Sequence, residues 1–228
     1  TASSVTITQP AELLINISST DETCNYLDNG TATSIVSGGF PPYSYSWLPG
    51  AYTTSAISNL TENTYTLTVT DSLNCTQKET AEITEPALLG ITFTSQIEVS
   101  CFGGNDGTVT GTPSGGTPDY TFSWMPGGDT TSTITGLTAG SYTLTIQDSN
   151  NCIASTPVTV SQPPAALTAT LSSTPVSCFG GSDGTVASVA SGGTPPYNFV
   201  WTPGNYNGEN LSNLTAGSYT VTITDASG

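Results

Sequence analysis

Short runs of alternating apolar and polar residues, rich in Thr, Val, Ile and Tyr, recur along the whole chain. Clusters of Gly, Pro, Asn and Asp separate these runs at intervals of about ten residues. Helical periodicity is absent, so the pattern predicts an all-β sandwich. In the middle third, the predicted strands are 91–99, 107–112, 119–124, 131–136, 140–147 and 153–160.

The run at 140–147 indicates which face of a strand enters the core. Tyr142, Leu144 and Ile146 alternate with threonines and therefore share one face, which we expect to be buried. A Tyr at this place, after the TAG turn, resembles the tyrosine corner of immunoglobulin-like sandwiches. Trp124 resembles their core tryptophan, so the sequence predicts an immunoglobulin-like sandwich.

The landmarks of this module return at a fixed step of 77 residues, as in Trp47, Trp124 and Trp201. Such a period is longer than the 20 to 50 residues typical of solenoid repeats and long enough for a small core of its own. We therefore expect tandem domains in an extended array. The expected segments are 1–10, the last strand of a preceding repeat; 11–86, repeat 1; 87–163, repeat 2; and 164–228, repeat 3, truncated before its last strand.

The truncation leaves two interpretations open. The chain is either an excerpt from a longer array, with neighbouring repeats as its partners, or it assembles by strand donation. In the second case, residues 1–10 complete the third repeat of another copy.

Composition excludes several functions. Seventeen acidic residues stand against one basic residue, Lys78, and there is no His. A formal charge of −16 disfavours nucleic acid and anionic lipid, and no run is long enough to insert into a membrane. Without His, nucleophilic catalysis and most zinc sites lose their usual components, so we expect no enzyme and no required cofactor. Paired carboxylates could still cleave a glycoside, but the acids are scattered over equivalent turns.

The five cysteines follow the repeat. Cys24 and Cys75 lie 51 residues apart, and Cys101 and Cys152 have the same spacing. We predict Cys24–Cys75 and Cys101–Cys152 disulfides in an oxidising, extracellular or cell-surface location, and Cys178 has no partner in this scheme. The alternative is free thiols.

The string SCFGGNDGTVTGTPSGGTPDYTFSW, followed by GLTAGSYTLTIQDSNNC, resembles the SprB repeat, as does SCFGGSDGTVASVASGGTPPYNFVW with NLTAGSYTVTITD. The first module is a more divergent copy, with Asn25-Tyr26-Leu27 where the others have Phe-Gly-Gly. The resemblance implies PKD-like, immunoglobulin-like domains of large surface or secreted proteins of Bacteroidetes, including adhesins of gliding motility. It offers no catalytic residues.

Oxygen-bearing side chains sit on equivalent turns and after equivalent strands. Carboxylates and amides of this kind could hold Ca²⁺, although Asp and Asn favour such turns without any metal. A Cys101–Cys152 bond would bring some of them to one end of the sandwich. The candidate calcium ligands are Asp106, Asp148, Asn151, Asp183 and Asp225.

Two weaker signals concern glycans. Asp71-Ser72-Leu73 and Asp129-Thr130-Thr131 resemble the Asp-Ser/Thr-X acceptor pattern of bacteroidete O-glycosylation, which makes Ser72 and Thr130 candidate sites. The repeated Tyr and Trp residues could stack on sugars, although core packing explains their positions equally well.

These observations favour a structural and adhesive array, a disulfide-stapled stalk or filament. One alternative is an array of modules that bind surface glycans or proteins, and another is an accessory region of a secreted enzyme.

Overall fold

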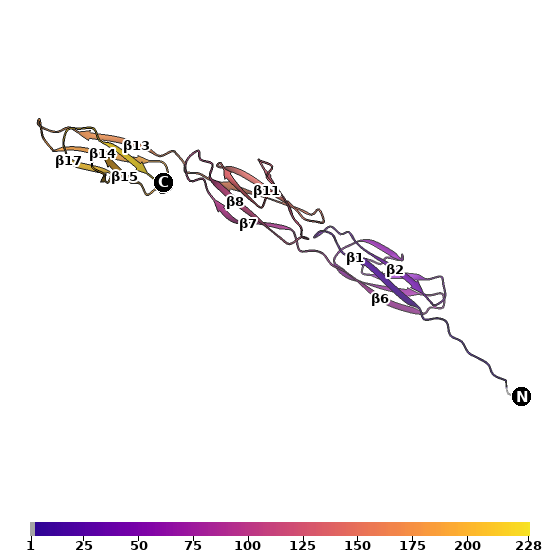
Figure 1. Ribbon diagram of the computed structural model, residues 1–228. Helices are drawn as coiled ribbons and strands as arrows, with labels where there is room; N and C mark the ends of the chain where they lie inside the picture. The colour runs from indigo at the N-terminus through magenta and orange to yellow at the C-terminus, as the bar shows by residue number, and fades with distance from the viewer. Residues whose placement is uncertain (1–2) are drawn as a thin grey trace. The chain divides into compact units, whose positions relative to one another are not determined.

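The computed structural model describes residues 3–228, in which strands, turns and loops occur without any helix (Figure 1). The expected all-β fold class is confirmed. The strands predicted at 140–147 and 153–160 agree to the residue, and the other four ranges of the middle repeat shift by one or two residues at one or both ends. Local alternation therefore specifies these strands well.

The first repeat consists of two three-stranded antiparallel sheets, ordered β1-β2-β4 and β3-β5-β6. In the second sheet, β5 lies in the centre and pairs with β3 on one side and β6 on the other. The strands are β1 (Leu14–Thr20), β2 (Gly30–Ser37), β3 (Ser44–Leu48), β4 (Ala56–Leu60), β5 (Asn63–Thr70) and β6 (Thr76–Ile83).

The second repeat has the same two sheets, ordered β10-β8-β7 and β12-β11-β9. Its strands are β7 (Gly90–Ile97), β8 (Gly107–Ser114), β9 (Thr121–Met125), β10 (Thr133–Leu137), β11 (Gly140–Gln147) and β12 (Ile153–Val160).

The third repeat differs in its second sheet. Its sheets are ordered β13-β14-β17 and β16-β15-β18, so that the strand equivalent to β5 forms an edge. A two-residue strand, β16, adds to the other side of the sheet. The strands are β13 (Thr168–Thr174), β14 (Gly184–Ser191), β15 (Asn198–Thr202), β16 (Tyr206–Asn207), β17 (Asn210–Leu214) and β18 (Thr220–Thr224).

A single hydrophobic core lies between the two sheets of the first repeat. Ala32 and Ile57 come from one sheet, and Trp47, Leu67 and Ile83 come from the other, each at most 5% exposed. Burial of such side chains stabilises the sandwich by about 1.5–3 kcal/mol each. The alternation seen in the sequence thus places its apolar face inside.

The tyrosine corner and the core tryptophan are confirmed. The Tyr142 hydroxyl donates to the Thr138 carbonyl at 3.0 Å, four residues upstream, and the ring is 8% exposed. Trp124 is completely buried, and its indole Nε1 donates to the Thr131 carbonyl at 3.0 Å. Buried Tyr and Trp need such partners because an unpaired polar atom in a core is costly.

One irregularity recurs in all three repeats. Asn59, Gly136 and Asn213 occupy the same repeat position and have φ values of 56°, 71° and 59°. The register shifts beside each of them, which marks a β-bulge in the edge strands β4, β10 and β17. Asn and Gly suit the position because they tolerate the left-handed region.

The contacts divide the chain into two compact units. The first contains the first repeat together with residues 113–121 and 146–154, which are two loops of the second repeat with their flanking strand ends. The second contains residues 91–112 and 122–145 and everything from Ser155 to Gly228. These two loops of the second repeat therefore pack with the first repeat.

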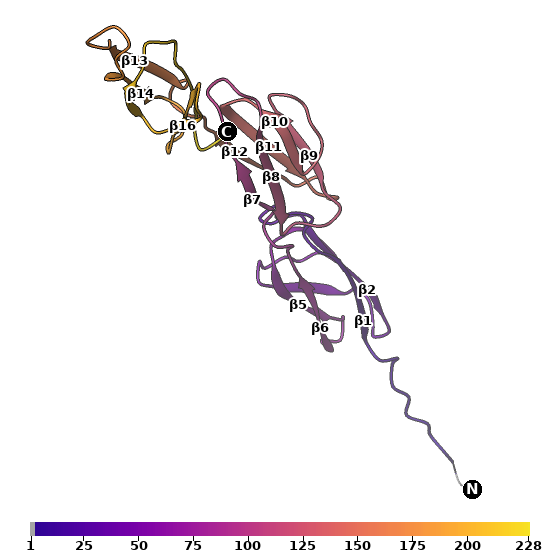
Figure 2. The ribbon, with the colours of Figure 1, turned by 60° about the vertical axis from the view of Figure 1, so that its left-hand side comes forward.

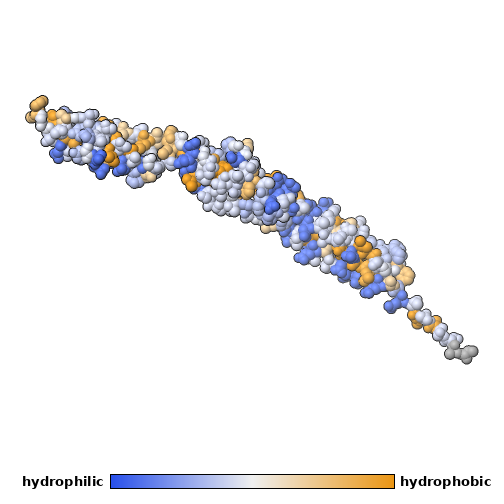
Figure 3. All heavy atoms as spheres, in the orientation of Figure 1, coloured by the Kyte–Doolittle hydropathy of each residue, from blue (hydrophilic) through white to orange (hydrophobic). Residues whose placement is uncertain are grey.

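Residues 3–13 form no strand, and Figure 2 shows them as a plain trace leading to β1. Within this segment Val5 is 89% and Ile7 is 93% exposed. Apolar atoms are visible on the surface of this part of the chain in Figure 3. Of the predicted strand at 1–10, residues 1 and 2 lie outside the described residues.

Candidate functional site

One group of the predicted calcium ligands closes the loop that carries the first cysteine of each repeat. Asp106 Oδ1 accepts the Ser100 N–H at 3.0 Å, and Asp183 Oδ1 accepts the Ser177 N–H at 2.9 Å. Asn29 does the same for Thr23 in the first repeat, at 3.0 Å. A neutral Asn thus replaces the carboxylate at one of the three positions, which is consistent with a hydrogen-bonding role.

The other group organises the loop that follows the fifth strand. Asp148 Oδ2 accepts the Thr117 N–H at 2.8 Å, while Oδ1 accepts the N–H groups of Asn150 and Cys152 at 2.9 and 2.8 Å. Asp71 and Asp225 bond to their own loops in the same way. Each carboxylate therefore joins two loops of its repeat through backbone donors.

These hydrogen bonds lower several pKa values because they favour the ionised form. The Phe40 N–H is the largest cause for the pKa of Asp71, and the Thr194 N–H for that of Asp225. Hydrogen bonds from Ser100 lower the pKa of Asp106, and bonds from Ser177 lower that of Asp183.

The two groups of carboxylates lie at opposite ends of a strand, contrary to the expected convergence. Asp183 directly precedes β14, whereas Asp225 bonds to Thr194 beyond the other end of β14. Asp106 precedes β8, and Asp148 bonds to Thr117 after β8, in the same relation.

Asn151 lies in the same loop as Asp148. Its N–H donates to the Asp148 carbonyl at 3.1 Å, and its Oδ1 accepts from Gln147 Nε2 at 3.2 Å. Across residues 3–228 no three His, Cys, Asp or Glu side chains gather as a metal site. Calcium binding by Asp106, Asp148, Asn151, Asp183 and Asp225 stays a prediction.

The disulfide pairing predicted from the spacing is wrong. Cys24 is bonded to Cys152, 128 residues away, with a Cα–Cα distance of 5.7 Å. Cys75, Cys101 and Cys178 are exposed and have no disulfide partner within residues 3–228. The bond joins the first repeat to a loop of the second.

The strand geometry explains why Cys24 and Cys75 cannot pair. Cys24 precedes β2. The Cys75 N–H donates to Asp71 Oδ1, and Asp71 Oδ2 accepts from the N–H of Phe40, which lies beyond the far end of β2. Eight residues of strand span about 26 Å, but a disulfide requires Cα atoms about 4.4–6.8 Å apart. Cys101 and Cys152 have equivalent places around β8.

Further contacts of the first unit surround the Cys24–Cys152 bond. Asn150 Nδ2 donates to the Thr23 carbonyl at 2.9 Å, and Asn25 Nδ2 donates to the Pro86 carbonyl at 3.1 Å. The Tyr26 N–H donates to Glu85 Oε2 at 3.0 Å. The Tyr26 contact has a counterpart in the second repeat, where the Gly103 N–H donates to Gln162 Oε1 at 2.8 Å. Only the Asn25 side-chain bond depends on the divergent sequence, because Phe102 and Phe179 stand at the equivalent positions.

The second joint repeats one of these contacts. Ser227 Oγ donates to the Ser100 carbonyl at 3.0 Å, and these residues are the counterparts of Asn150 and Thr23, 77 residues on. Beside it, Cys101 and Phe102 line a cavity of about 210 Å³ with residues of the third repeat. Phe102 is 49% exposed there, whereas its counterpart Phe179 is fully exposed.

Most of the aromatic residues considered for sugar stacking are used inside the repeats, whereas Tyr206 is 49% exposed. Trp47, Trp124 and Trp201 are at most 1% exposed. The hydroxyls of Tyr43, Tyr120 and Tyr197 each donate to a glycine carbonyl at 2.6–2.7 Å.

The two candidate glycosylation sites, Ser72 and Thr130, are exposed. The Ser72 hydroxyl also donates to the Phe40 carbonyl at 3.0 Å. Modification of either residue stays a prediction.

The chain resembles solved structures of tandem domains. Three N-terminal domains of the bacteriophage RB49 highly immunogenic outer capsid protein (Hoc) align at 19% identity and a TM-score of 0.49, over 94% of this chain and 86% of that one. Immunoglobulin domains 1–5 of Sidekick-1 align at 14% identity and a TM-score of 0.45, over 96% of this chain and 57% of that one. Likenesses at this level carry no functional information.

No curated protein matches the chain in sequence. In residues 3–228 there is no helix with the length and apolar character needed to cross a membrane. The sequence model of the SprB repeat matches three segments, 16–52, 94–129 and 170–206, one in each repeat. Each match begins in the first strand of a repeat and extends past its core tryptophan. The chain therefore carries three SprB repeats.

Proposed function

We propose that this chain is a structural and adhesive region of a large bacterial cell-surface or secreted protein, in which disulfides between successive repeats build a stalk or filament. SprB repeats suggest an extracellular repeat or adhesion-type region. Repeat families of this kind are typically not enzymes. The stalk and its covalent joints are inferred from the disulfide between the first two repeats.

The Cys24–Cys152 bond is the observation that carries the proposal. A disulfide within a repeat would stabilise that repeat alone, whereas a bond from one repeat to the next makes the joint itself covalent. The hydrogen bond from Asn150 Nδ2 to the Thr23 carbonyl links the same two repeats. Such a joint suits a region that transmits force.

Surface presentation fits the charge of the chain. A net charge of −16 with one basic residue favours solubility and disfavours adsorption to nucleic acid. Sugar stacking by the conspicuous aromatic residues has less support, because Trp47 and Tyr43 are engaged by their own repeat.

The single lysine gives a direct test of the covalent joint. A lysine-specific protease cuts the denatured chain after Lys78 only, which separates Cys24 from Cys152 but leaves Cys101 and Cys152 together. With thiols blocked and no reductant, we expect the two fragments to remain linked and to separate after reduction. Fragments that separate without reductant would contradict the proposal, and Cys24→Ser is the matched control.

Force spectroscopy tests the stalk itself. Pulled from its ends, the oxidised chain should keep the 128-residue segment between Cys24 and Cys152 out of the extension. Reduction should add roughly 46 nm of contour length. If oxidised and reduced chains extend equally, the joint does not bear load.

A further inference from the structure

The chain contains two Asn-Gly dipeptides, Asn29-Gly30 and Asn207-Gly208. In such a pair the backbone nitrogen of the glycine can attack the side-chain amide of the asparagine, because glycine has no side chain to hinder the approach. Whether the attack occurs in a folded protein depends on how freely the local backbone opens. The two pairs differ in this respect.

The first pair, Asn29-Gly30, is held by its surroundings. Asn29 Oδ1 accepts the Thr23 N–H at 3.0 Å, and Asn29 Nδ2 donates to Thr23 Oγ1 at 2.7 Å. Gly30 is buried at the start of β2, where a Cβ atom would lie 2.6 Å from Ile83 Cγ2 and 2.9 Å from the Leu60 carbonyl oxygen. Neither the amide nor the glycine can therefore turn toward the other without breaking this packing.

The second pair, Asn207-Gly208, is open. Both residues are exposed, and a Cβ atom on Gly208 would meet nothing within 4 Å beyond its chain neighbours. Asn207 is held only by the two-residue edge strand β16, in which it pairs with Val200. The attacking group, the Gly208 N–H, donates to the Phe199 carbonyl over a long distance of 3.3 Å. A short edge strand opens more readily than a core strand, so this pair can reach the reactive geometry.

The backbone that follows Asn207 holds two buried side chains of the third repeat. The Gly208 carbonyl accepts the Trp201 indole N–H at 2.9 Å, and Trp201 is 1% exposed. The Glu209 carbonyl accepts both the N–H and the hydroxyl of Ser188, at 2.9 and 3.1 Å. Ser188 is 2% exposed. The third core therefore depends on where these two carbonyls lie.

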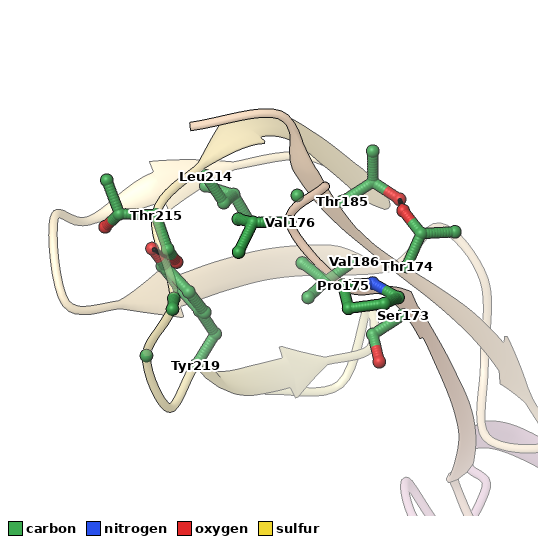
Figure 4. Close-up of a pocket in the computed structure, with 12 residues that line it drawn as sticks. Ser173, Thr174, Pro175, Val176, Thr185, Val186, Leu214, Thr215 and Tyr219 are labelled. Carbon is green, nitrogen blue, oxygen red and sulfur yellow. Dashed lines mark hydrogen bonds between the residues drawn. The ribbon is translucent and has the colours of Figure 1, made fainter. Parts of the chain in front are cut away.

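The same segment leads directly into β17, which pairs with β14 and ends at Leu214. Leu214 is 8% exposed, and Figure 4 shows it next to Val176 in the lining of a cavity. A change in backbone length at position 207 would therefore displace a strand that contributes to the core.

The first two repeats have the same connection without the reactive pair. Thr53-Thr54 and Thr130-Thr131 stand at the positions of Asn207-Gly208. The Thr54 and Thr131 carbonyls accept the indole N–H groups of their own tryptophans, each at 3.0 Å. Threonine has no side-chain amide that could react, so the chemistry at this connection is confined to the third repeat.

We propose that Asn207-Gly208 is a site of spontaneous modification, at which Asn207 loses ammonia and becomes isoaspartate, and that this change loosens the third repeat but not the first two. Water is the only co-reactant. The change is irreversible and needs no enzyme, so it limits the lifetime of one repeat.

The reaction passes through a succinimide ring. The Gly208 nitrogen gives up its proton and bonds to Cγ of Asn207, while the bond from Cγ to Nδ2 breaks and ammonia leaves with that proton. Water then opens the ring. Cleavage between the ring nitrogen and Cγ gives aspartate, and cleavage between the ring nitrogen and the backbone carbonyl carbon gives isoaspartate. No oxidant or reductant takes part.

The isoaspartate product changes the core because Cβ of residue 207 becomes part of the backbone. The carbonyls of Gly208 and Glu209 then no longer meet Trp201 and Ser188 in the same geometry, and a buried donor without a partner is costly. The aspartate product keeps the original backbone and adds only an exposed charge. The two products should therefore differ in their effect on the third repeat.

Peptide mapping of the folded chain over time tests the site. At mildly alkaline pH, where the attacking nitrogen loses its proton more readily, Asn207 should convert at least about tenfold faster than Asn29. Mass spectrometry after digestion with a Glu-specific protease measures the conversion. An isoaspartyl methyltransferase, which modifies isoaspartate but not aspartate, identifies the product. In the denatured chain, the two pairs should react at rates within about threefold of each other.

The matched control is Asn207→Gln, which keeps the amide but moves it one carbon away from the glycine nitrogen. This variant should remain unmodified at position 207 over the same period. Equal rates at Asn207 and Asn29 in the folded chain would overturn the proposal, and so would aspartate as the only product.

Hydrogen exchange of the indole groups tests the effect on the fold. In the chain that carries isoaspartate, the Trp201 indole N–H should exchange at least about tenfold faster than before, whereas those of Trp47 and Trp124 should not change. Fresh Asn207→Asp protein has the added charge on the original backbone, and its indole groups should exchange as in the unmodified chain. Unchanged exchange at Trp201 in the isoaspartate form, or equal acceleration in Asn207→Asp, would overturn the proposed loosening.

Discussion

The first and third repeats share their sequence landmarks but differ in how well their cores are closed. Leu67 and Val69 on β5 are completely buried, whereas their counterparts Val221 and Ile223 on β18 are only half-buried. The tryptophans at the centre, Trp47 and Trp201, are buried in both. In the first repeat, β6 pairs with β5 and shields this side of the core from water. The described residues of the third repeat have no strand at that place, yet the centre of the core is buried there too.

The largest expected effect concerns the cysteine that precedes the second strand. Cys24→Ser opens a 128-residue loop and should destabilise the first repeat by up to about 5 kcal/mol. Cys178→Ser, the equivalent change in the third repeat, should alter stability by less than about 0.5 kcal/mol because Cys178 is exposed and unpaired in the described chain. Hydrogen exchange in increasing urea, resolved by repeat, measures both. Similar losses would remove this difference between the repeats.

The next effect concerns equivalent isoleucines. Ile83→Ala removes a side chain that is 1% exposed and should cost the first repeat about 2–5 kcal/mol. Ile7→Ala, at 93% exposure, should leave the free energy of unfolding unchanged within about 0.5 kcal/mol. Urea unfolding at low protein concentration gives both values. A large loss from Ile7→Ala would show that residues 3–10 pack against the rest of the chain.

A smaller effect should be the same in both repeats. Tyr43→Phe and Tyr197→Phe each remove a hydroxyl that donates to a glycine carbonyl, at 2.6 and 2.7 Å. Each should cost about 1 kcal/mol, since a hydrogen bond is lost and an acceptor is left behind. The same urea experiment applies. A negligible effect in the third repeat alone would mean that the open edge loosens this loop as well.

The smallest effect is a dependence on pH. Backbone hydrogen bonds, first those from Phe40 and Thr194, lower the pKa values of Asp71 and Asp225 in the folded state. Their contribution is complete above the unfolded value of about 3.9 and is lost as the pH falls through the lowered folded values. Urea midpoints should therefore decrease below about pH 4.

Asn variants separate this effect from general acid unfolding. Asp71→Asn should flatten the dependence in the first repeat, and Asp225→Asn should flatten it in the third. An unchanged slope in both variants would contradict a role for these carboxylates.

The strands and their buried faces could be predicted from the sequence because both follow from local alternation. Tyr142, Leu144 and Ile146 share a face in any strand, so their burial required no knowledge of the rest of the chain. The tyrosine corner was predictable for the same reason, since the hydroxyl reaches only four residues upstream.

The disulfide required knowledge of strand direction and of the joint between repeats. The spacing of 51 residues within a repeat appeared decisive, but Cys24 precedes the second strand and Cys75 follows the fifth, at opposite ends. The separation of 128 residues equals that spacing plus one repeat of 77, which is a signal for pairing between repeats. Likewise, an Asp in a turn does not reveal whether backbone N–H groups already occupy its oxygens, as they do at Asp148.

The recurring bulge has a consequence for colloidal behaviour. Asn59, Gly136 and Asn213 interrupt the edge strands β4, β10 and β17, and Pro157 lies in the edge strand β12. Bulges and prolines at such places discourage flat, indiscriminate stacking of sheets into aggregates. Tandem sandwiches of one fold would otherwise be prone to misassembly, because they offer similar edges to their neighbours.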